Sequence, residues 1–319
     1  MFIPKIKNYH QSIKLQDIDF PLNGYSVNDG GAIMNDGYLK VINSTFVNNT
    51  AKYSGGAIWY ADAYNCTFIN NSAYVGGAIW YGDAYNCTFI SNIAFEGGAI
   101  GTYHSICSVV NCSFVNNTAK YIGGSIRVYY GICFVVNSTF FNNFVAYGSA
   151  IYNSGNCSVV NSNFINNTAD DLGGAIYNKG NFSVLNSTFV NGIADNGDAI
   201  YNYGGNCSVL NSTFVNNIAN LYGGGAIYNY KGIYSVVNSN FVNNIANLYG
   251  GAICSDNKGI YSVLNCTFIN NTANCTKFYG GGAIYNDNSN CSVVNCTFIN
   301  NTAFGDGGLF MFIMVIALS

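Results

Sequence analysis

Two aspartates and a histidine are the side chains of this sequence whose spacing best suits chemistry. Asp62, Asp83 and His104 each lie four residues after the isoleucine of a Gly-Ala-Ile phrase. If successive phrases stack as rungs, these side chains form a column, and two carboxylates about 5 Å apart would share a proton or hold a cation. Carboxylate pairs at such separations also serve retaining glycosidases. The spacing therefore offers a catalytic alternative based on Asp62, Asp83 and His104.

Aromatic side chains accompany the two aspartates. Trp59 and Tyr60 precede Asp62, and Trp80 and Tyr81 precede Asp83. An aromatic and acidic patch is consistent with a carbohydrate site. The alternative is recent duplication, because residues 57–66 and 78–87 are near copies and duplication alone would align both sets. No lysine or arginine lies in the predicted column to act as a base, so a lyase is disfavoured.

These residues lie within a repeat that runs through most of the chain. Isoleucines of a Gly-Gly-Ala-Ile phrase recur at spacings of 21 to 31 residues, most of them 24–27. A second phrase, Asn-Ser/Cys-Thr-Phe-x-x-Asn, lies between the copies. A period in this range indicates a solenoid. The isoleucines are Ile33, Ile58, Ile79, Ile100, Ile126, Ile151, Ile176, Ile200, Ile227, Ile253 and Ile284, and Phe310 takes the next position.

Both phrases have the composition of β-strands. They are short, rich in β-branched and aromatic residues, and bounded by Gly and Asn. Only 8% of the chain is charged, so the charge pairs of a helical repeat are missing. We therefore predict an all-β fold, a right-handed parallel β-helix of about 12 coils of about 25 residues, with two or three strands per coil.

Alternation along the second phrase predicts which side chains fill the interior. Alternate side chains of a strand share a face, so Val110, Cys112 and Phe114 are predicted to face the core. The same parity places Leu185, Ser187 and Phe189 there. Stacked coils would then form an aromatic column from Phe46, Phe68, Phe89 and Phe114, and an amide ladder from Asn49, Asn71, Asn92 and Asn117.

The residues that follow the isoleucines form a second pattern. The position directly after isoleucine is usually tyrosine, and the next position is often asparagine. A tyrosine and asparagine stripe that faces water suits recognition, and an ordinary outer face of a solenoid is the alternative. The tyrosines are Tyr152, Tyr177, Tyr201, Tyr228 and Tyr285; the asparagines are Asn153, Asn178, Asn202, Asn229 and Asn286.

The twelve cysteines are predicted to be small buried residues rather than a disulfide framework. Ten of them recur at two positions of the repeat, and cysteines stacked in register have Cβ atoms nearly a strand spacing apart, whereas a disulfide needs about 3.8 Å. The first position holds Cys66, Cys87, Cys112, Cys266 and Cys296, and the second holds Cys107, Cys133, Cys157, Cys207 and Cys291.

Composition limits the class of partner and the domain organisation. The net charge is −3 and Arg127 is the single arginine, so there is no basic patch for nucleic acid. Residues 1–25 lack the repeat and are predicted to be an N-terminal cap or partial leader. Residues 26–308 form the β-helix, and 309–319 form an apolar tail or a truncated last coil, too short to span a bilayer. No cofactor is predicted.

The two phrases together resemble the repeats of polymorphic outer-membrane proteins, in which a Gly-Gly-Ala-Ile/Leu/Val tetrad alternates with a Phe-x-x-Asn tetrad. Gly173–Ile176 and Phe114–Asn117 are copies of the two. Ten of eleven Phe copies keep the Asn, whereas Phe189 is followed by Gly192. The first tetrad departs at Ser125, Ser149 and Asp198. The Asn- and Thr-rich sequence of the repeat is also similar to adhesin-like proteins of methanogenic archaea.

This resemblance covers roughly residues 30–310 and implies a β-helical, pectate-lyase-like passenger region displayed at the cell surface. It implies a non-enzymatic adhesin or structural protein that attaches to host or neighbouring cells, or to glycans, through its repeat faces. Membrane anchoring is not encoded in the chain, and no clear signal peptide is present. The alternatives are a polysaccharide-active enzyme that uses Asp62 and Asp83, and a fragment without independent function.

Overall fold

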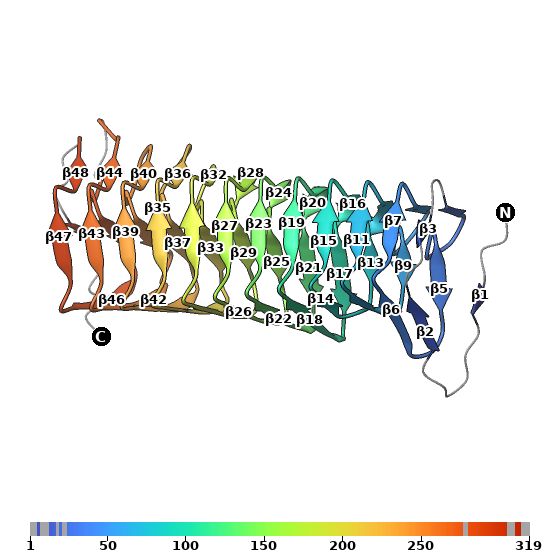
Figure 1. Ribbon diagram of the computed structural model, residues 1–319. Coiled ribbons are helices and arrows are strands. Elements are labelled where there is room, and N and C mark those ends of the chain that lie inside the picture. Colours follow the sequence, from blue (N-terminus) through green and yellow to red (C-terminus); the bar gives the residue numbers. More distant parts are fainter. Residues whose placement is uncertain are drawn as a thin grey trace. The chain divides into compact units, whose positions relative to one another are not determined.

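The computed structural model describes residues 5–6, 13–16, 19–20, 24–276, 280–304 and 310–313. Within these ranges the regular elements are β-strands that pair in parallel. The chain forms two compact units, 1–158 and 159–319, and the boundary lies inside strand β26 (Asn156–Val160). Each unit is a parallel β-helix, as predicted. Each coil adds a strand to each of four sheets, here called A to D (Figure 1), so the prediction of two or three strands per coil missed one sheet.

The first unit contains the following strands. Sheet A has β1 (Lys5–Ile6), β5 (Ile33–Asn35), β9 (Ile58–Trp59), β13 (Ile79–Trp80), β17 (Ile100–Tyr103), β21 (Ile126–Tyr129) and β25 (Ile151–Asn153). Sheet B has β2 (Ile13–Gln16), β6 (Leu39–Ile42), β10 (Asp62–Tyr64), β14 (Ala84–Tyr85), β18 (Ile106–Val110) and β22 (Ile132–Val136). Sheet C has β3 (Asp19–Phe20), β7 (Thr45–Val47), β11 (Thr67–Ile69), β15 (Thr88–Ile90), β19 (Ser113–Val115) and β23 (Thr139–Phe141). Sheet D has β4 (Tyr25–Ser26), β8 (Thr50–Ala51), β12 (Ser72–Val75), β16 (Ile93–Glu96), β20 (Thr118–Ile122) and β24 (Phe144–Tyr147).

The second unit repeats this order. Sheet A has β29 (Ile176–Asn178), β33 (Ile200–Tyr203), β37 (Ile227–Tyr230), β41 (Ile253–Asp256), β45 (Ile284–Asp287) and β49 (Phe310–Ile313). Sheet B has β30 (Asn181–Leu185), β34 (Asn206–Leu210), β38 (Ile233–Val237), β42 (Ile260–Leu264) and β46 (Asn290–Val294). Sheet C has β27 (Asn163–Ile165), β31 (Thr188–Val190), β35 (Thr213–Val215), β39 (Asn240–Val242), β43 (Thr267–Ile269) and β47 (Thr297–Ile299). Sheet D has β28 (Thr168–Leu172), β32 (Ile193–Ala194), β36 (Ile218–Ala219), β40 (Ile245–Ala246), β44 (Thr272–Ala273) and β48 (Thr302–Ala303).

The ends of the chain are only partly described. The predicted cap at 1–25 and tail at 309–319 lie mostly outside the described residues. The described residues of 1–25 supply strands β1 to β4, which pair with β5 to β8. Phe310 pairs with Ile284, which is the position that its place in the repeat predicts.

Phenylalanine side chains of sheet C form the predicted column inside each unit. In the first unit Phe89 and Phe114 are fully buried, with ring centroids 4.7 Å apart and planes within 4° of parallel. The second unit continues the same stacking, for example between Phe214 and Phe241 at 4.8 Å. Identical apolar side chains therefore stack at the strand spacing, which is how identical coils fill a narrow interior.

The asparagine of the Phe-x-x-Asn tetrad forms a buried amide ladder, as predicted. Asn71 Nδ2 donates to Asn92 Oδ1 at 3.0 Å and to the carbonyl oxygen of Phe46 at 3.0 Å. Its backbone nitrogen donates to the same Asn92 oxygen. Each side chain thus satisfies backbone groups that a buried turn would leave without partners. A second ladder runs through the second unit from Asn178 to Asn202 and Asn229.

The Gly-Gly-Ala-Ile tetrad is explained by close backbone approach. Gly55 has a φ of +64°, and a Cβ there would overlap the carbonyl oxygen of Ile58. A Cβ at Gly56 would overlap the carbonyl oxygen of Gly77 on the next coil. Only glycine fits both positions, so the tetrad marks a turn that presses on the neighbouring coil.

The predicted core face is correct for Cys112, Phe114, Ser187 and Phe189, which are all buried. It is wrong for Val110 and Leu185, which are partly exposed, while their neighbours Val109 and Val184 fill the interior. The cause is the asparagine that follows each of them, because Asn111 and Asn186 adopt φ values of +54° and +50° and interrupt the alternation.

The cysteines of the described residues are free, as predicted, and most are buried. Cys87 shows how they replace serine. Its sulfur donates to the carbonyl oxygen of Tyr85 at 3.3 Å, in the way that the Ser138 hydroxyl donates to Val136 at 2.9 Å. The neighbouring thiol of Cys112 and burial raise the pKa of Cys87 to about 12, so this thiol stays protonated and poorly nucleophilic.

Candidate functional site

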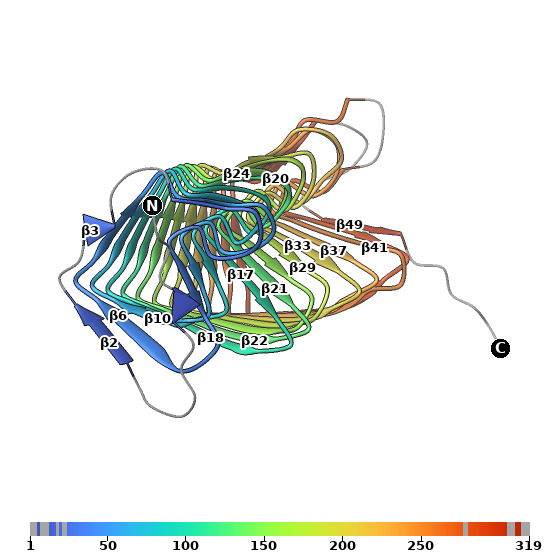
Figure 2. The same cartoon turned by 90° about the vertical axis from the view of Figure 1, so that its right-hand side faces the viewer.

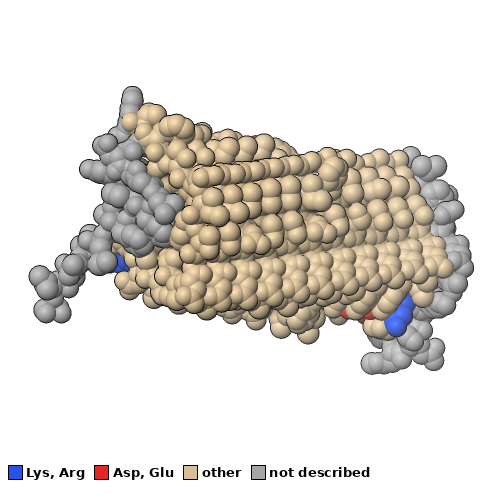
Figure 3. All heavy atoms as spheres, turned by 60° about the vertical axis from the view of Figure 1, so that its left-hand side comes forward, with Lys and Arg blue, Asp and Glu red and all other residues tan. Residues whose placement is uncertain are grey.

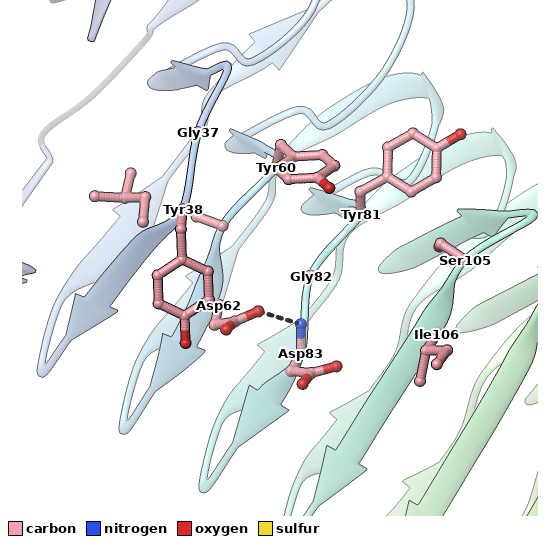
Figure 4. Close-up of a pocket in the computed structure, with 11 residues that line it drawn as sticks. Gly37, Tyr38, Tyr60, Asp62, Tyr81, Gly82, Asp83, Ser105 and Ile106 are labelled. Carbon is pink, nitrogen blue, oxygen red and sulfur yellow. Dashed lines mark hydrogen bonds between the residues drawn. The ribbon is translucent and has the colours of Figure 1, made fainter. Parts of the chain in front are cut away.

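A pocket of about 260 Å³ lies in the first unit, at the turn where sheet A continues into sheet B (Figure 4). Strands β17 and β18 show this turn in a later coil of the same unit (Figure 2). The pocket brings together Asp62, Asp83, Tyr60 and Tyr81, four of the residues that the sequence singled out. It is lined by Gly37, Tyr38, Leu39, Tyr60, Ala61, Asp62, Tyr81, Gly82, Asp83, Ser105 and Ile106.

Asp62 and Asp83 lie on adjacent coils, and both bind backbone amides. Asp62 Oδ1 accepts a hydrogen bond from the backbone nitrogen of Asp83 at 3.0 Å, the contact drawn in Figure 4. Asp83 Oδ1 accepts one from the nitrogen of Ser108 at 2.7 Å, and its Oδ2 accepts the Tyr85 hydroxyl at 3.1 Å. The carboxylates therefore connect successive coils at a point where β10 and β14 are short.

The electrostatic surroundings of Asp62 are mixed. Burial raises the pKa of its carboxyl above the ordinary value, and the charge of Asp83 acts in the same direction. The backbone amide of Asp83, the Tyr38 hydroxyl and the ammonium of Lys40 oppose that rise.

The predicted alignment of His104 with the two aspartates is wrong. Ala84 pairs with Val109, so Ser108 occupies the rung after Asp83. Ile79 pairs with Ile100 and Ala84 pairs with Val109, so the later coil has four more residues between these two pairs. The extra residues place His104 in the turn. There its backbone nitrogen donates to the Tyr129 carbonyl oxygen and its ring stacks on Tyr130 at 5.3 Å.

A row of exposed aromatic side chains starts at the pocket and continues along the same turn. Tyr60 and Tyr81 have ring centroids 5.8 Å apart, and Tyr103 and Tyr129 are 5.7 Å apart. Tyr60, Tyr103 and Tyr130 are 48%, 41% and 57% exposed. We call this set the aromatic row and define it as Tyr60, Tyr81, Tyr103, His104, Tyr129 and Tyr130.

Four members of the aromatic row have a left-handed backbone. The φ values are +66° at Tyr60, +58° at Tyr81, +49° at His104 and +53° at Tyr130. Bulky residues rarely adopt this conformation, which costs an L-residue about 1–2 kcal/mol. In the described part of the second unit, the corresponding turns hold no aromatic residue at positive φ. The positive-φ residues there are Gly204, Lys231, Asn257, Lys258 and Asn288.

The two tryptophans lie beside the row and are half-buried. Trp59 and Trp80 pair in register. Trp80 covers Gly101, where a Cβ would lie 2.6 Å from the indole ring. The guanidinium of Arg127 lies 5.9 Å from the centre of the same ring. Trp80 therefore packs against sheet A and supports the row.

The expectation that the tyrosine and asparagine stripe faces water is wrong. Tyr152, Tyr177, Tyr201 and Tyr285 are only 5–7% exposed, Tyr228 is half-buried, and the asparagines are 0–1% exposed. The asparagines point inward, and turns pack over the tyrosines. Tyr249, from the turn after β40, stacks on Tyr285 at 4.6 Å. A role for these tyrosines in binding would require those turns to move.

Sequence reasoning missed part of the site. Tyr38 lines the pocket, and Tyr103, Tyr129 and Tyr130 extend the row. One signal was available, because tyrosines occupy turn positions where glycine and asparagine are expected. Among the described residues, no three His, Cys, Asp or Glu side chains gather in a way that could hold a metal ion. No described helix is long and apolar enough to cross a membrane.

Comparison with known proteins identifies the repeat. The family model of the Chlamydia polymorphic membrane protein repeat matches residues 43–60, 65–81, 161–179 and 265–287. Three of these segments begin with an Asn-x-Ser/Thr triplet and continue through Phe-x-x-Asn to Gly-Ala-Ile. The fourth begins at Asn161 and also continues through Phe-x-x-Asn to Gly-Ala-Ile. No curated protein matches the chain. Segments of both units are thus similar to the Chlamydia polymorphic membrane protein repeat, in agreement with the resemblance that the two phrases carry.

Proposed function

We propose that this chain is a cell-surface adhesin without enzymatic activity, and that it attaches to host or neighbouring cells through glycans bound at the aromatic row. The match to a repeat of membrane proteins supports a location at the cell surface. The observation that carries the proposal is the left-handed backbone of Tyr60, Tyr81, His104 and Tyr130. Strain that recurs on several coils points to a selected function rather than to packing.

The chemistry of the row supports a glycan as the ligand. Tyrosine offers a flat apolar face and a hydroxyl group with little conformational freedom to lose. Tyr60 and Tyr130 are about half exposed, so part of each side chain is accessible to a ligand. In the pocket, Asp62 and Asp83 add acceptors for sugar hydroxyl groups.

The catalytic alternative is less well supported. Asp83 accepts hydrogen bonds through both carboxylate oxygens, and Asp62 binds the next backbone amide. His104 does not share their column. These contacts account for both aspartates as links between coils. Lys40 pairs with Asp62 on the preceding coil, so the expectation that no lysine lies in this column is wrong. Its ammonium opposes the rise in the pKa of Asp62.

The proposal is tested by measuring binding of the full chain to a glycan panel and to intact cells, with release of sugar products followed in the same wells. We expect saturable binding without new reducing ends or unsaturated products. Absence of binding to every glycan and cell type would contradict the adhesin. Product release would contradict the non-enzymatic assignment, and an Asp62→Asn, Asp83→Asn variant would then show whether this pair carries the reaction.

A further inference from the structure

The aromatic row repeats along the axis of the first unit at the coil spacing. Five successive coils contribute the pocket residue Tyr38 and the row members Tyr60, Tyr81, Tyr103 and Tyr129, and the last of these coils also contributes Tyr130. Ring centroids lie 5.8 Å apart between Tyr60 and Tyr81, whose planes are inclined by 60°, and 5.7 Å apart between Tyr103 and Tyr129, whose planes are inclined by 17°. A ligand that contacts all of these rings must itself repeat at nearly one coil.

A chain of β-linked pyranose rings has this property. Each ring presents an apolar C–H face that packs on an aromatic side chain, and each ring of an extended chain advances by nearly one strand spacing, about 5 Å. A single sugar would contact only one or two tyrosines, whereas a chain parallel to the axis would contact every coil in turn.

Acceptor groups lie beside the start of the row. A carboxylate accepts about four hydrogen bonds, so Asp62 and Asp83 keep capacity beyond the backbone amides and the Tyr85 hydroxyl that they bind. Both line the pocket with Tyr60 and Tyr81 (Figure 4). Hydroxyl groups of a sugar in the pocket would donate to them.

The charges near the row decide which polysaccharide fits. Asp62 and Asp83 repel carboxylated or sulfated sugars. Among the described residues, the cations nearest to the row are both engaged: Arg127 with Glu96 at 2.7 Å, and Lys40 with the Tyr38 and Tyr64 rings at 5.7 and 5.3 Å. Charged side chains are sparse in the chain as a whole, 8% of its residues, and Figure 3 shows this scarcity on one face of the described part. A neutral ligand is therefore favoured over an anionic one.

We infer that the aromatic row binds a linear, neutral, β-linked polysaccharide that lies along the axis of the first unit with one sugar ring per coil. This inference rests on the proposed function and adds the chemical class, direction and register of the ligand. It also assigns the two aspartates a place at one end of the bound chain.

The test is calorimetric titration of the full chain with neutral β-linked gluco-, manno- and galacto-oligosaccharides, from the monosaccharide to the octasaccharide. In at least one series, affinity should rise with each added ring until about five coils are covered and then level off, by a total of about a hundredfold or more. Raising the salt concentration about tenfold should change the affinity by less than about twofold, because no ion pair forms.

Two results would overturn the inference. Affinity that stops rising at the disaccharide would show a single pocket rather than an axial chain. Binding confined to sulfated or carboxylated polymers, lost at high salt, would show that charge dominates. If cells still bind through the row while no neutral oligosaccharide binds, the ligand class is wrong and the adhesin proposal stands; if cells do not bind either, the adhesin proposal itself fails.

Discussion

Arg127 Nε lies 2.7 Å from Glu96 Oε2, and these are the only arginine and the only glutamate of the chain. The ion pair joins β21 of sheet A to the end of β16 in sheet D, beneath the aromatic row. The side chains are only 10% and 18% exposed, and the Arg127 guanidinium also lies 4.5 Å from the centre of the Tyr129 ring. The pair therefore holds a turn of the first unit against the sheet that carries the row.

Removing one partner of this pair should destabilise the fold. Glu96→Gln leaves a buried guanidinium without its counter-charge, which typically costs about 3–5 kcal/mol of unfolding free energy for a fully buried pair, and less here because of the remaining exposure. Denaturant unfolding measures the loss. The double variant Glu96→Gln, Arg127→Met should recover part of it, and equal losses in the single and double variants would contradict the coupling.

Gly192 and Asp198 depart from the repeat together, in a single coil of the second unit. Gly192 replaces the ladder asparagine, and Asp198 replaces the second glycine of the tetrad. The carboxylate of Asp198 lies in the space that the missing side chain would occupy, since a Cβ at Gly192 would be 2.8 Å from both of its oxygens. Its Oδ2 accepts the backbone nitrogen of Ile218 at 3.0 Å.

Gly192→Asn alone should therefore destabilise the second unit by about 1–3 kcal/mol, because the new side chain meets the Asp198 carboxylate. Gly192→Asn combined with Asp198→Gly restores the repeat and should recover the wild-type stability or exceed it. Denaturant unfolding of both single variants and the double variant completes a mutant cycle. Additive losses would show that the two departures are independent.

Asp198 should also make stability depend on pH. Burial raises the pKa of this carboxyl well above its usual range, and its Oδ1 has no hydrogen-bond partner. The folded state therefore binds the proton more tightly than the unfolded state does. The stability that the Asp198 carboxyl contributes is fully present below the ordinary aspartate pKa, near 4. It is lost as the pH rises through the folded pKa. Unfolding of Asp198→Asn across this range should lack that fall; an unchanged pH profile would show that Asp198 is ionised in the fold.

Phe114→Ala should cost about 3–5 kcal/mol, the usual loss for a large buried aromatic residue. Phe114 is fully buried between Phe89 and Phe140, with ring centroids 4.7 Å away on each side. Val109→Ala and Val110→Ala provide a matched comparison, because Val109 is buried and Val110 is partly exposed. Denaturant unfolding should rank them in that order. A loss under about 1 kcal/mol for Phe114→Ala would contradict the assigned interior.

The repeat predicts the interior of this fold well, since every coil meets the same neighbours above and below. The Phe114 column, the Asn71 ladder and the free cysteines all follow from identical residues in register. Val110 was misplaced because the left-handed turn at Asn111 breaks the alternation of the strand. Such a turn is visible in sequence only as an asparagine, which is also common in other conformations.

The candidate site was harder to predict because it depends on coil length. The short coils kept Asp62 and Asp83 together, whereas four inserted residues moved His104 away from them. Tyr152 was a candidate for recognition on the condition that its stripe faces water. It is only 7% exposed, and no periodic pattern in the sequence reports that burial.

The most direct test of the proposed site replaces Tyr60, Tyr81, His104 and Tyr130 together by asparagine, a residue that the repeat itself uses at positive φ. Tyr203→Ala, which removes a 43% exposed tyrosine of the second unit, is the control. Cell and glycan binding of the full chain is measured beside its unfolding free energy. We predict that the row variant loses about tenfold or more in affinity while its stability stays the same or rises, because asparagine relieves backbone strain. Unchanged binding by the row variant would contradict the account.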